Sequence, residues 1–467
     1  MTKSTPHRNR SLTNNLAAVL AALLFILPFA SEAQERLDSP RSRPPTLHDC
    51  IAIALGESPL LEASRYDVLS AGQEVRAAQG MALPQLTGSA GYELFSGSPT
   101  TKFSVVSLGE SPIAVTSHHV VGLGAVEIYS GKLRYPLFKD GSILGLNNAP
   151  AIAEKKAKRQ ALAWTVNLKR EDVIYRITDE FVLTVSARNR TVLVDRRVTL
   201  LEQSVAITEE EQKRGLKLPI DLKVAKEQLS GARTLAKLLR EQAVAGSLEL
   251  SRSLGQPSSS NLALSNILPD PPDPPPTAEQ LLGGSLARHP SLQVQRAKID
   301  QAKQGYRLER FRLYPSVSLD GAATYIDDFS PANASIFTGA ITVSVPIFDF
   351  GAQLATARSK LMTYKAEEAR LLSVADDVTY EVLKAYESIY ALSHNILGLQ
   401  DEIAKAERDV AVIESERAQG IAEPLTTIEK ELHLIAKQDE IEGVKARRLT
   451  LYAFLQKAAG GSWKWIP

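Results

Sequence analysis

Residues 316–351 read SVSLDGAATYIDDFSPANASIFTGAITVSVPIFDFG, a stretch in which apolar and polar side chains alternate twice before a proline. The apolar or small members of the alternation are Val317, Leu319, Gly321, Ala323 and Tyr325, followed by Phe337, Ile341, Val343 and Val345. A period of two is typical of strands whose two faces meet different surroundings. We therefore predict strands at about 316–328 and 336–347, joined by a short loop.

The first half of the chain contains a second pair of alternating segments. Its apolar positions are Leu86, Ala90, Tyr92 and Leu94, then Tyr129, Leu133 and Tyr135, which predicts strands at about 85–97 and 120–137. Four strands of about ten residues suit a tilted membrane barrel, although a soluble β-sandwich would alternate in the same way. Four strands cannot close a barrel alone, because unpaired strand edges are costly in lipid. In a membrane, several chains would have to share one barrel.

The chain is an internal duplication. Pro59 and Pro84 match Pro290 and Pro315 at a spacing of 231 positions, and the segment 135–141 matches 345–351 at a spacing of 210. The first copy therefore carries 21 extra residues between these landmarks. We predict a first repeat at 34–255, a linker rich in Ser, Asp and Pro at 256–276, a second repeat at 277–460 and a short tail at 461–467.

Long helices follow each strand pair. Stretches rich in Ala, Leu, Glu, Lys and Arg at about 151–213 and 352–419 predict helices on the order of 100 Å long. Their apolar residues recur at steps of three, four and seven, as coiled coils require. Shorter helical stretches at about 46–83, 219–255, 278–313 and 424–460 would cover each long helix as two pieces placed end to end. Gly215 with Pro219, and Gly420 with Pro424, mark the helix reversals.

The amino terminus has the pattern of a secretory signal. A basic stretch precedes an apolar run from Leu16 to Ala30, and small residues around Ala33 suit a peptidase, so residues 1–33 are predicted to be a signal peptide. Beyond Ala33 the sequence contains no apolar run long enough for a membrane-spanning helix. The lone cysteine, Cys50, excludes an intrachain disulfide framework and is expected to be buried on a helix.

The charge balance gives no general attraction to nucleic acid. Lys and Arg number 54 and Asp and Glu number 53, so no nucleic-acid partner is predicted. The sequence shows no metal-ligand cluster, nucleophile elbow or phosphate loop, so we predict neither an enzyme nor a cofactor. His118 and His119 in the long loop between the first two strands have no further ligands near them in sequence, and we interpret them as solvated loop residues.

Together, the signal, the two repeats, the paired strands ending at prolines and the glycine hairpins resemble the TolC-like outer-membrane efflux family, over about residues 46–460. The resemblance implies a mainly α fold with four transmembrane strands per chain, three chains sharing a twelve-stranded barrel, and helices that continue it as a periplasmic tunnel. It implies a homotrimeric outer-membrane channel with a periplasmic extension, which passively conducts substrates from an inner-membrane pump and a periplasmic adaptor in a tripartite efflux or type I secretion system.

The same resemblance assigns roles to residues of the two glycine hairpins. Gly215, Leu216, Gly420 and Ile421 correspond to the periplasmic tip on which an adaptor docks. The glycines also permit the turn, and the two roles are compatible.

The resemblance also places a gate near these tips. Asp221 matches the family's gating aspartate, and Glu429 matches one acidic position of the constriction, where converging carboxylates would favour cations. The family's tyrosine and arginine partners are replaced by Arg417 and Ala422, and Thr426 occupies the second acidic position. Arg417 is the candidate cationic partner, and a solvated helix face is the alternative for Glu429.

A soluble periplasmic coiled-coil protein with a structural or adaptor role is the alternative function. It accounts for the signal and the long helices. It does not account for two strand pairs with such regular alternation.

Overall fold

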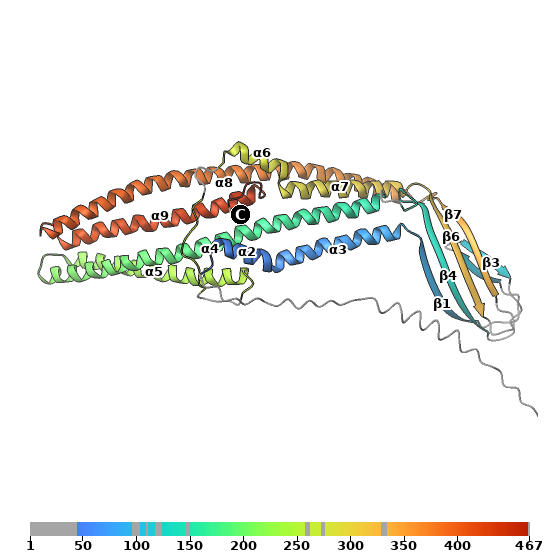
Figure 1. The fold of residues 1–467 in the computed structure, drawn as a ribbon, viewed down its shortest axis with the longest axis horizontal. Helices are drawn as coiled ribbons and strands as arrows, with labels where there is room; N and C mark the ends of the chain where they lie inside the picture. Colours follow the sequence, from blue (N-terminus) through green and yellow to red (C-terminus); the bar gives the residue numbers. More distant parts are fainter. Residues whose placement is uncertain are drawn as a thin grey trace, which may run out of the picture. The chain divides into compact units, whose positions relative to one another are not determined.

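A computed structural model describes residues 44–95, 103–108, 111–116, 124–145, 149–256, 262–271, 276–327 and 334–465. The predicted signal peptide, the pair His118 and His119, and parts of the predicted linker lie outside the described residues. Within these ranges, residues from Pro44 onward fold as one unit of long helices with a sheet at one end (Figure 1).

The main sheet joins the strand pairs of both repeats. Its antiparallel strands are β1 Gln85–Phe95, β4 Gly124–Lys139, β6 Ser316–Asp327 and β7 Ala334–Ser344, and the short β5 Ser142–Ile143 pairs with the end of β4. The order is β1-β4-β6-β7, so β4 of the first repeat hydrogen-bonds β6 of the second. The outer edges of β1 and β7 have no partner strand among the described residues.

One expectation about this region was wrong. The stretch between the first two predicted strands was interpreted as a loop, but it contains an antiparallel hairpin of β2 Phe103–Leu108 and β3 Ser111–Thr116. Strand β7 also ends at Ser344, before the predicted end at 347, because no strand of the described chain continues the ladder beside residues 345–349.

The two faces of the sheet differ in polarity. On one face, most side chains are apolar and exposed: Leu86, Tyr92, Tyr129, Leu133, Leu319, Tyr325, Phe337, Ile341 and Val343. Glu127, opposite Tyr92, is a charged member of this face. On the other face, Arg134 Nε donates to Asp320 Oδ1 at 2.8 Å, and the hydroxyls of Ser89 and Ser130 are hydrogen-bonded at 2.7 Å. The sheet therefore presents an uncovered apolar surface on one side and a hydrogen-bonded polar surface on the other.

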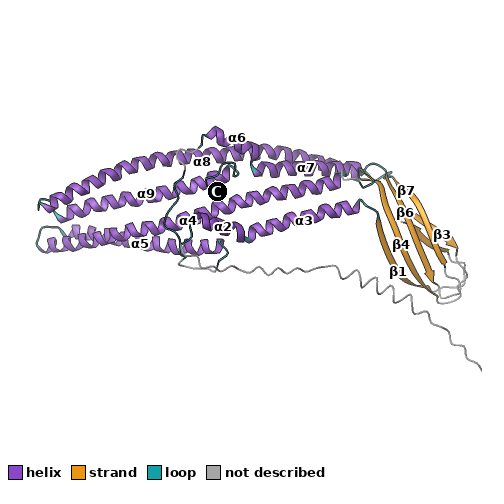
Figure 2. Cartoon of the chain, in the orientation of Figure 1, coloured by secondary structure: helices purple, strands orange, loops and turns teal. Residues whose placement is uncertain are grey.

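Two long helices dominate the rest of the chain (Figure 2). These are α4 Pro150–Lys213, with 64 residues, and α8 Ala352–Ala418, with 67 residues. The shorter helices are α2 Leu47–Glu57, α3 Pro59–Met81, α5 Pro219–Ser253, α6 Ala278–Arg288, α7 Pro290–Phe311 and α9 Pro424–Ala458. The prediction of long helices combined with antiparallel strands is confirmed.

Two predicted helices are broken at a proline. The stretches 46–83 and 278–313 were each expected to form one helix, but Ser58 and His289 are extended, with ψ of 115° and 127°. Each precedes a proline whose ring disfavours the helical conformation of the residue before it, and the proline then opens the next helix.

The helices follow the order of the strands to which they connect. Helix α4 packs against α3 and α7, and α7 packs against α8, so the order near the sheet is α3-α4-α7-α8. Towards the hairpin tips, α5 and α9 replace α3 and α7, giving α5-α4-α9-α8. Helix α8 is therefore covered by one pair of shorter helices placed end to end, α7 and α9, and α4 by two such pairs. Helices α3 and α5 form one border of the layer and α8 forms the other.

Helix α8 has a buried seam and a separate exposed apolar stripe. The buried residues recur at steps of three, four and seven: Val378, Val382, Ala385, Ile389, Ile396, Leu399 and Ala406. The exposed residues Leu383, Tyr390 and Leu397 are spaced by seven. The first pattern is a coiled-coil seam against α6 and α9, while the second has no covering helix among the described residues.

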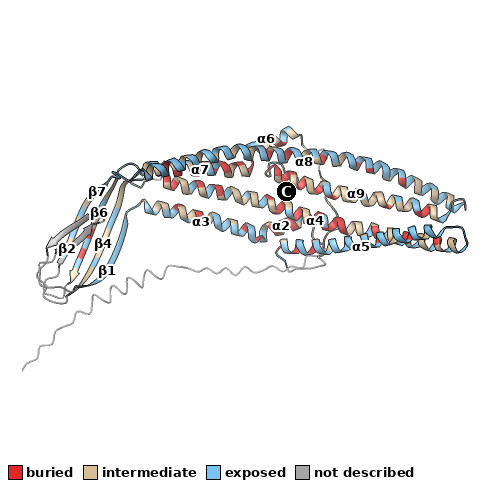
Figure 3. Ribbon diagram, turned by 180° about the vertical axis from the view of Figure 1, so that it is seen from behind, coloured by how far each residue is buried: buried red, intermediate tan, exposed pale blue. Residues whose placement is uncertain are grey.

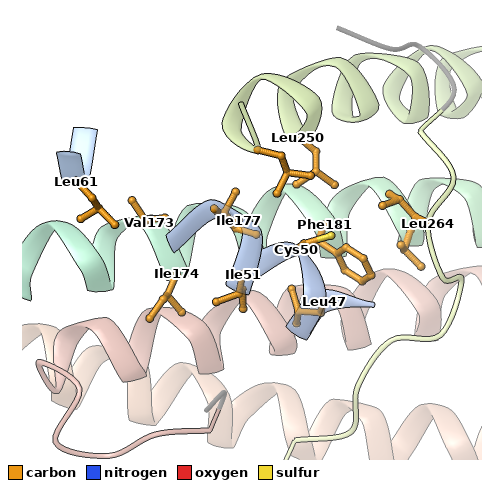
Figure 4. Close-up of a cluster of buried hydrophobic side chains, with 13 residues drawn as sticks. Leu47, Cys50, Ile51, Leu61, Val173, Ile174, Ile177, Phe181, Leu250 and Leu264 are labelled. Carbon is orange, nitrogen blue, oxygen red and sulfur yellow. The ribbon is translucent and has the colours of Figure 1, made fainter. Parts of the chain in front are cut away.

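The largest described core lies midway along the helices, where α2, the middle of α4 and the end of α5 meet (Figure 4). Cys50, Ile177, Phe181 and Leu250 are fully buried there, as Cys50 was predicted to be. Buried positions along the helices are otherwise confined to stripes (Figure 3).

The carboxy-terminal tail is part of this packing. Trp465 contacts the core around Phe181, the α8–α9 core around Tyr452 and a third cluster that includes Leu449. Its backbone N–H donates to Gln456 Oε1 at 3.1 Å, and Gln456 Nε2 donates to Glu171 Oε2 at 3.4 Å. The tail thus joins helices of both repeats.

We expect Phe181→Ala to lower the free energy of unfolding by about 3–5 kcal/mol, because it leaves a cavity where α2, α4 and α5 pack. Val192→Ala, on an exposed position of the same helix, should change it by less than about 1 kcal/mol. Denaturant unfolding followed by circular dichroism compares the two variants. Equal losses would contradict this placement of the core.

Acidic side chains beside this core are destabilised as anions. Burial, and secondarily the charge of Glu249, raises the pKa of Asp179; burial raises the pKa of Glu180 as well, with Glu249 and Asp179 adding to the shift. Glu180 Oε1 accepts from Ser253 Oγ at 2.9 Å, but Oε2 is buried with no hydrogen-bond partner in the part of the chain that the structure describes. Folding therefore favours the protonated forms.

Since the folded pKa exceeds the unfolded one, stability should rise as the pH falls from neutral towards the ordinary glutamate pKa. We expect Glu180→Gln to raise the stability at neutral pH and to flatten this pH dependence. Thermal unfolding measured between neutral and mildly acidic pH checks both. A wild-type protein that loses stability throughout this interval would contradict the assignment.

Candidate functional site

The two helix hairpins end in tips of the same backbone geometry. In the first, Gly215 has φ +78°, its N–H donates to Gln212 O at 2.9 Å, and Leu216 N–H donates to Glu211 O at 2.8 Å. These two hydrogen bonds satisfy carbonyl groups in the last turn of α4. They require a left-handed backbone conformation at residue 215, which glycine adopts without steric cost.

The second tip repeats these bonds. Gly420 has φ +76° and donates to Arg417 O at 3.0 Å, while Ile421 N–H donates to Glu416 O at 2.9 Å. The predicted reversals at the Gly-to-Pro segments are therefore present in both repeats, with Pro219 and Pro424 opening α5 and α9.

The tips differ in how the next helix begins. Asp221 Oδ2 accepts from the Leu218 backbone N–H at 2.9 Å, which satisfies a donor at the start of α5. At the matching position α9 has Thr426, and no side chain caps its first turn. Asp221 thus has a local structural role within the chain.

The tip side chains are apolar and exposed. Leu216 is 71% exposed and Ile421 is 70% exposed, and Leu218 and Ile220 beside the first tip are exposed as well. Leu218 and Ile220 were not predicted as residues of the tip surface, although their position beside the turn residues could have indicated it. A shallow hollow of about 360 Å³ follows the first tip, lined by Pro219, Leu222, Lys223, Lys226, Glu227 and Ser230.

The predicted gate residues lie near the tips but do not meet within the chain. Asp221 is in the first turn of α5, Arg417 in the last turn of α8 and Glu429 in the second turn of α9, and all three are exposed. No ion pair or hydrogen bond joins their side chains among the described residues. Any gate that uses them requires groups from another chain.

Ion pairs fasten the hairpins to one another behind the tips. Arg190 of α4 donates to both carboxylate oxygens of Asp439 on α9, at 2.7 and 3.0 Å, and the hydrogen bonds to Asp439 raise the pKa of Arg190. Arg196 Nη2 of α4 lies 3.5 Å from Glu431 Oε2 on α9. Because the tips lie beyond these contacts, their exposed residues are free to meet a partner.

The described residues show neither of two other kinds of feature. No helix among them combines the length and apolar character needed to cross a membrane. Nowhere in the same ranges do three or more His, Cys, Asp or Glu side chains gather so that they could hold a metal ion.

We expect Gly215→Ala to destabilise the first hairpin by about 1–2 kcal/mol, because alanine disfavours the left-handed conformation. Gly231→Ala is the matched control: it lies in the middle of α5, and both glycines have open space around an added Cβ. In a helix interior that substitution should stabilise by up to about 1 kcal/mol. Hydrogen exchange of the hairpin amides measures both, and equal protection in the two variants would contradict the strain argument.

Part of the chain matches a known protein family. Residues 281–461 match the family described as outer membrane efflux protein, which nearly coincides with the second predicted repeat. The pyoverdine export outer membrane protein OpmQ of Pseudomonas aeruginosa is 26% identical over 201 residues. That alignment covers 41% of this chain and spans only 40% of the length of OpmQ.

Solved structures share the fold over most of the chain. The outer membrane protein VceC of Vibrio cholerae has a TM-score of 0.70 at 18% identity, covering 89% of this chain and 96% of VceC. The CmeC outer membrane channel of Campylobacter jejuni has a TM-score of 0.71 at 14% identity, covering 100% of this chain and 95% of CmeC. Residues 281–461 therefore match the outer membrane efflux protein family, and the chain as a whole shares the fold of the outer-membrane proteins VceC and CmeC.

Proposed function

We propose that this protein is an outer-membrane channel, the exit duct of a tripartite efflux or type I secretion system, which conducts substrates passively. The observation that carries the proposal is the sheet of β1, β4, β6 and β7, which has an exposed apolar face and two edges without a partner strand among the described residues. Lipid suits the apolar face, and the polar face with Arg134 and Asp320 suits a water-filled interior.

The unpaired edges support closure by further copies. Strands β1 and β7 run antiparallel, since the strands alternate in direction across the order β1-β4-β6-β7. Strand β7 of one copy can therefore continue the antiparallel ladder with β1 of the next. A head-to-tail contact of this kind closes a ring, and three copies would give the twelve strands of the TolC-like fold.

The helices have open borders in the same places. The exposed stripe of Leu383, Tyr390 and Leu397 runs along α8, while Val224 and Leu238 are exposed on α5 at the opposite border. If β7 of one copy pairs with β1 of the next, α8 of the first copy would lie beside α5 of the second. The helical walls of three copies would then enclose a tunnel that continues the barrel into the periplasm.

The exposed tips suit docking of a periplasmic adaptor. Leu216 and Ile421 place apolar side chains at the end of the tunnel farthest from the sheet, beside Gly215 and Gly420, whose turns fix their direction. An adaptor bound there would connect the channel to an inner-membrane pump. Residues 1–33 serve in this proposal as the leader that directs the chain out of the cytoplasm.

In the proposed trimer the tips also form the gate. Asp221, Arg417 and Glu429 are exposed on helices that would approach a threefold axis, so pairing between copies would close the channel. The name of OpmQ assigns it pyoverdine export, which supports efflux as the general role here.

Fractionation of cells tests the proposal. We expect the mature protein in the outer membrane, and light scattering in mild detergent should give three times the mass of one chain after subtraction of bound detergent. The full chain is 50.8 kDa before removal of the leader. A monomer in the soluble periplasmic fraction would contradict the channel and favour a coiled-coil structural or adaptor protein.

The gate is tested in planar bilayers with charge-neutralising variants. We expect Glu429→Gln to lower the preference of the open channel for cations, because a ring of carboxylates is removed. Asp221→Asn keeps a side-chain oxygen for the Leu218 N–H while removing charge, whereas Asp221→Ala loses both. Raised resting conductance in both Asp221 variants would indicate a gate, and no change in either would contradict one.

A further inference from the structure

The internal duplication supplies a template for the contact between copies. In the first repeat, the segment from Tyr135 to Gly141 leads from β4 to α4 and is packed inside the chain against the start of β6 and the end of α7. In the second repeat, residues 345–351 lead from β7 to α8 at the open edge. The corresponding neighbour for them is the end of α3 and the start of β1 in the next copy.

The last two residues of the two segments have matching values of φ. Asp140 has φ +53° and Gly141 φ +79°, while the matching residues Phe350 and Gly351 have φ +52° and φ +81°. A contact made by one segment can therefore be transferred to the other through the spacings of 210 and 231 positions that relate the repeats.

Two contacts of the first segment matter here. Phe138 pairs with Val317 at the end of the β4–β6 ladder, and Asp140 Oδ1 lies 3.9 Å from Arg312 Nε. By the repeat spacings, Phe138 and Val317 correspond to Phe348 and to Leu86 of the next copy. Asp140 and Arg312 correspond in the same way to Phe350 and to Met81 of the next copy. The ion pair inside the chain is thus replaced by an apolar pair between chains.

All four transferred positions are uncovered in the single chain. Phe350 is 91% exposed, Met81 70%, Phe348 77% and Leu86 79%. The rings of Phe348 and Phe350 contact each other, with centroids 4.6 Å apart, so they form one apolar surface. A large aromatic residue with positive φ is also strained, and such strain is typical of residues retained for a contact.

The direction of the strands agrees with this pairing. Because β7 and β1 are antiparallel, the residues that follow β7 lie at the same end of the sheet as the residues that precede β1. Across the sheet, Gln85 of β1 pairs with Arg134 of β4, which pairs with Asp320 of β6, which in turn pairs with Ala340 of β7. Strand β7 continues beyond this row to Ser344. Applied to the pair Phe138 and Val317, the repeat spacings place the start of β1 in the next copy beside the residues that follow β7.

We propose that Phe348 and Phe350 of one copy pack on Leu86 and Met81 of the next, forming an apolar clasp at the junction of sheet and helices that selects assembly of this chain with itself. The proposal rests on the channel function proposed above. It adds that the contact between copies differs in chemistry from the equivalent contact inside each copy, which keeps the two kinds of junction from exchanging partners.

Cross-linking tests the clasp in the full chain in outer membranes. The variant Phe350→Cys/Met81→Cys treated with a short bismaleimide should give covalent dimers and trimers on denaturing gels, and neither single variant should. The background is low because Cys50 is the only native cysteine and is buried. The sheet-edge control is Ile341→Cys/Tyr92→Cys, which the same repeat spacings place opposite one another.

The controls separate the clasp from the function. If the sheet-edge pair links and the Phe350–Met81 pair does not, the clasp is wrong while the closed sheet remains. If neither pair links and the protein is a monomer, the proposed channel fails as well.

The apolar character of the clasp is tested by replacing Phe350 and Met81 with the residue types of the ion pair inside the chain. We expect Phe350→Asp and Met81→Arg each to speed dissociation of the trimer in dodecyl sulfate by about tenfold, and the double variant to recover most of the loss. Aspartate tolerates a positive φ better than phenylalanine, and Asp140 has it in the other repeat, so Phe350→Asp does not strain the single chain. A double variant no more resistant than the single ones would overturn the pairing.

Discussion

Strands β1 and β7 form the two edges of the sheet, and each presents a row of backbone N–H and C=O groups without a partner strand among the described residues. In water such an edge is tolerated, but beside an apolar face that suits lipid it has to be paired. The fold offers one way of pairing both edges, because the antiparallel order of the strands lets β7 of one copy pair with β1 of another. The helix order α3-α4-α7-α8 follows from the same constraint, since each helix continues the strand to which it is joined.

Duplication explains how one chain can serve both as a subunit and as a template for its neighbours. The β4–β6 contact inside the chain is the repeat-related equivalent of the contact proposed between chains. Identical junctions at both places would leave the sheet free to pair in the wrong register or with the wrong repeat. In the proposed assembly, the ion pair of Asp140 with Arg312 inside the chain and the apolar pair of Phe350 with Met81 between chains would give each edge its own partner.

The middle and the tips of the helices have different physical characters. In the middle, Phe181, Tyr452 and the tail residue Trp465 link helices of both repeats in continuous packing. Towards the tips, the packing between hairpins is confined to a narrow apolar seam that includes Leu200 and Ile428, and ion pairs such as Arg190 with Asp439 lie beside it. A region held by few apolar contacts opens at lower cost than the core, as a gate at the tips would require.

The sequence alone determined the element types, their order and the two reversals. Alternation with period two, coiled-coil periodicity and the Gly-to-Pro segments are local signals, because backbone sterics and side-chain direction act between near neighbours. These local signals did not predict the helix breaks before Pro59 and Pro290 or the β2–β3 hairpin. Only the tertiary structure decided that β4 joins β6, that Trp465 belongs to the core, and that Asp221 caps α5 without contacting Arg417 or Glu429. These facts depend on contacts between residues far apart in sequence, whose free energies arise from burial and pairing in three dimensions and leave no periodic trace in the chain.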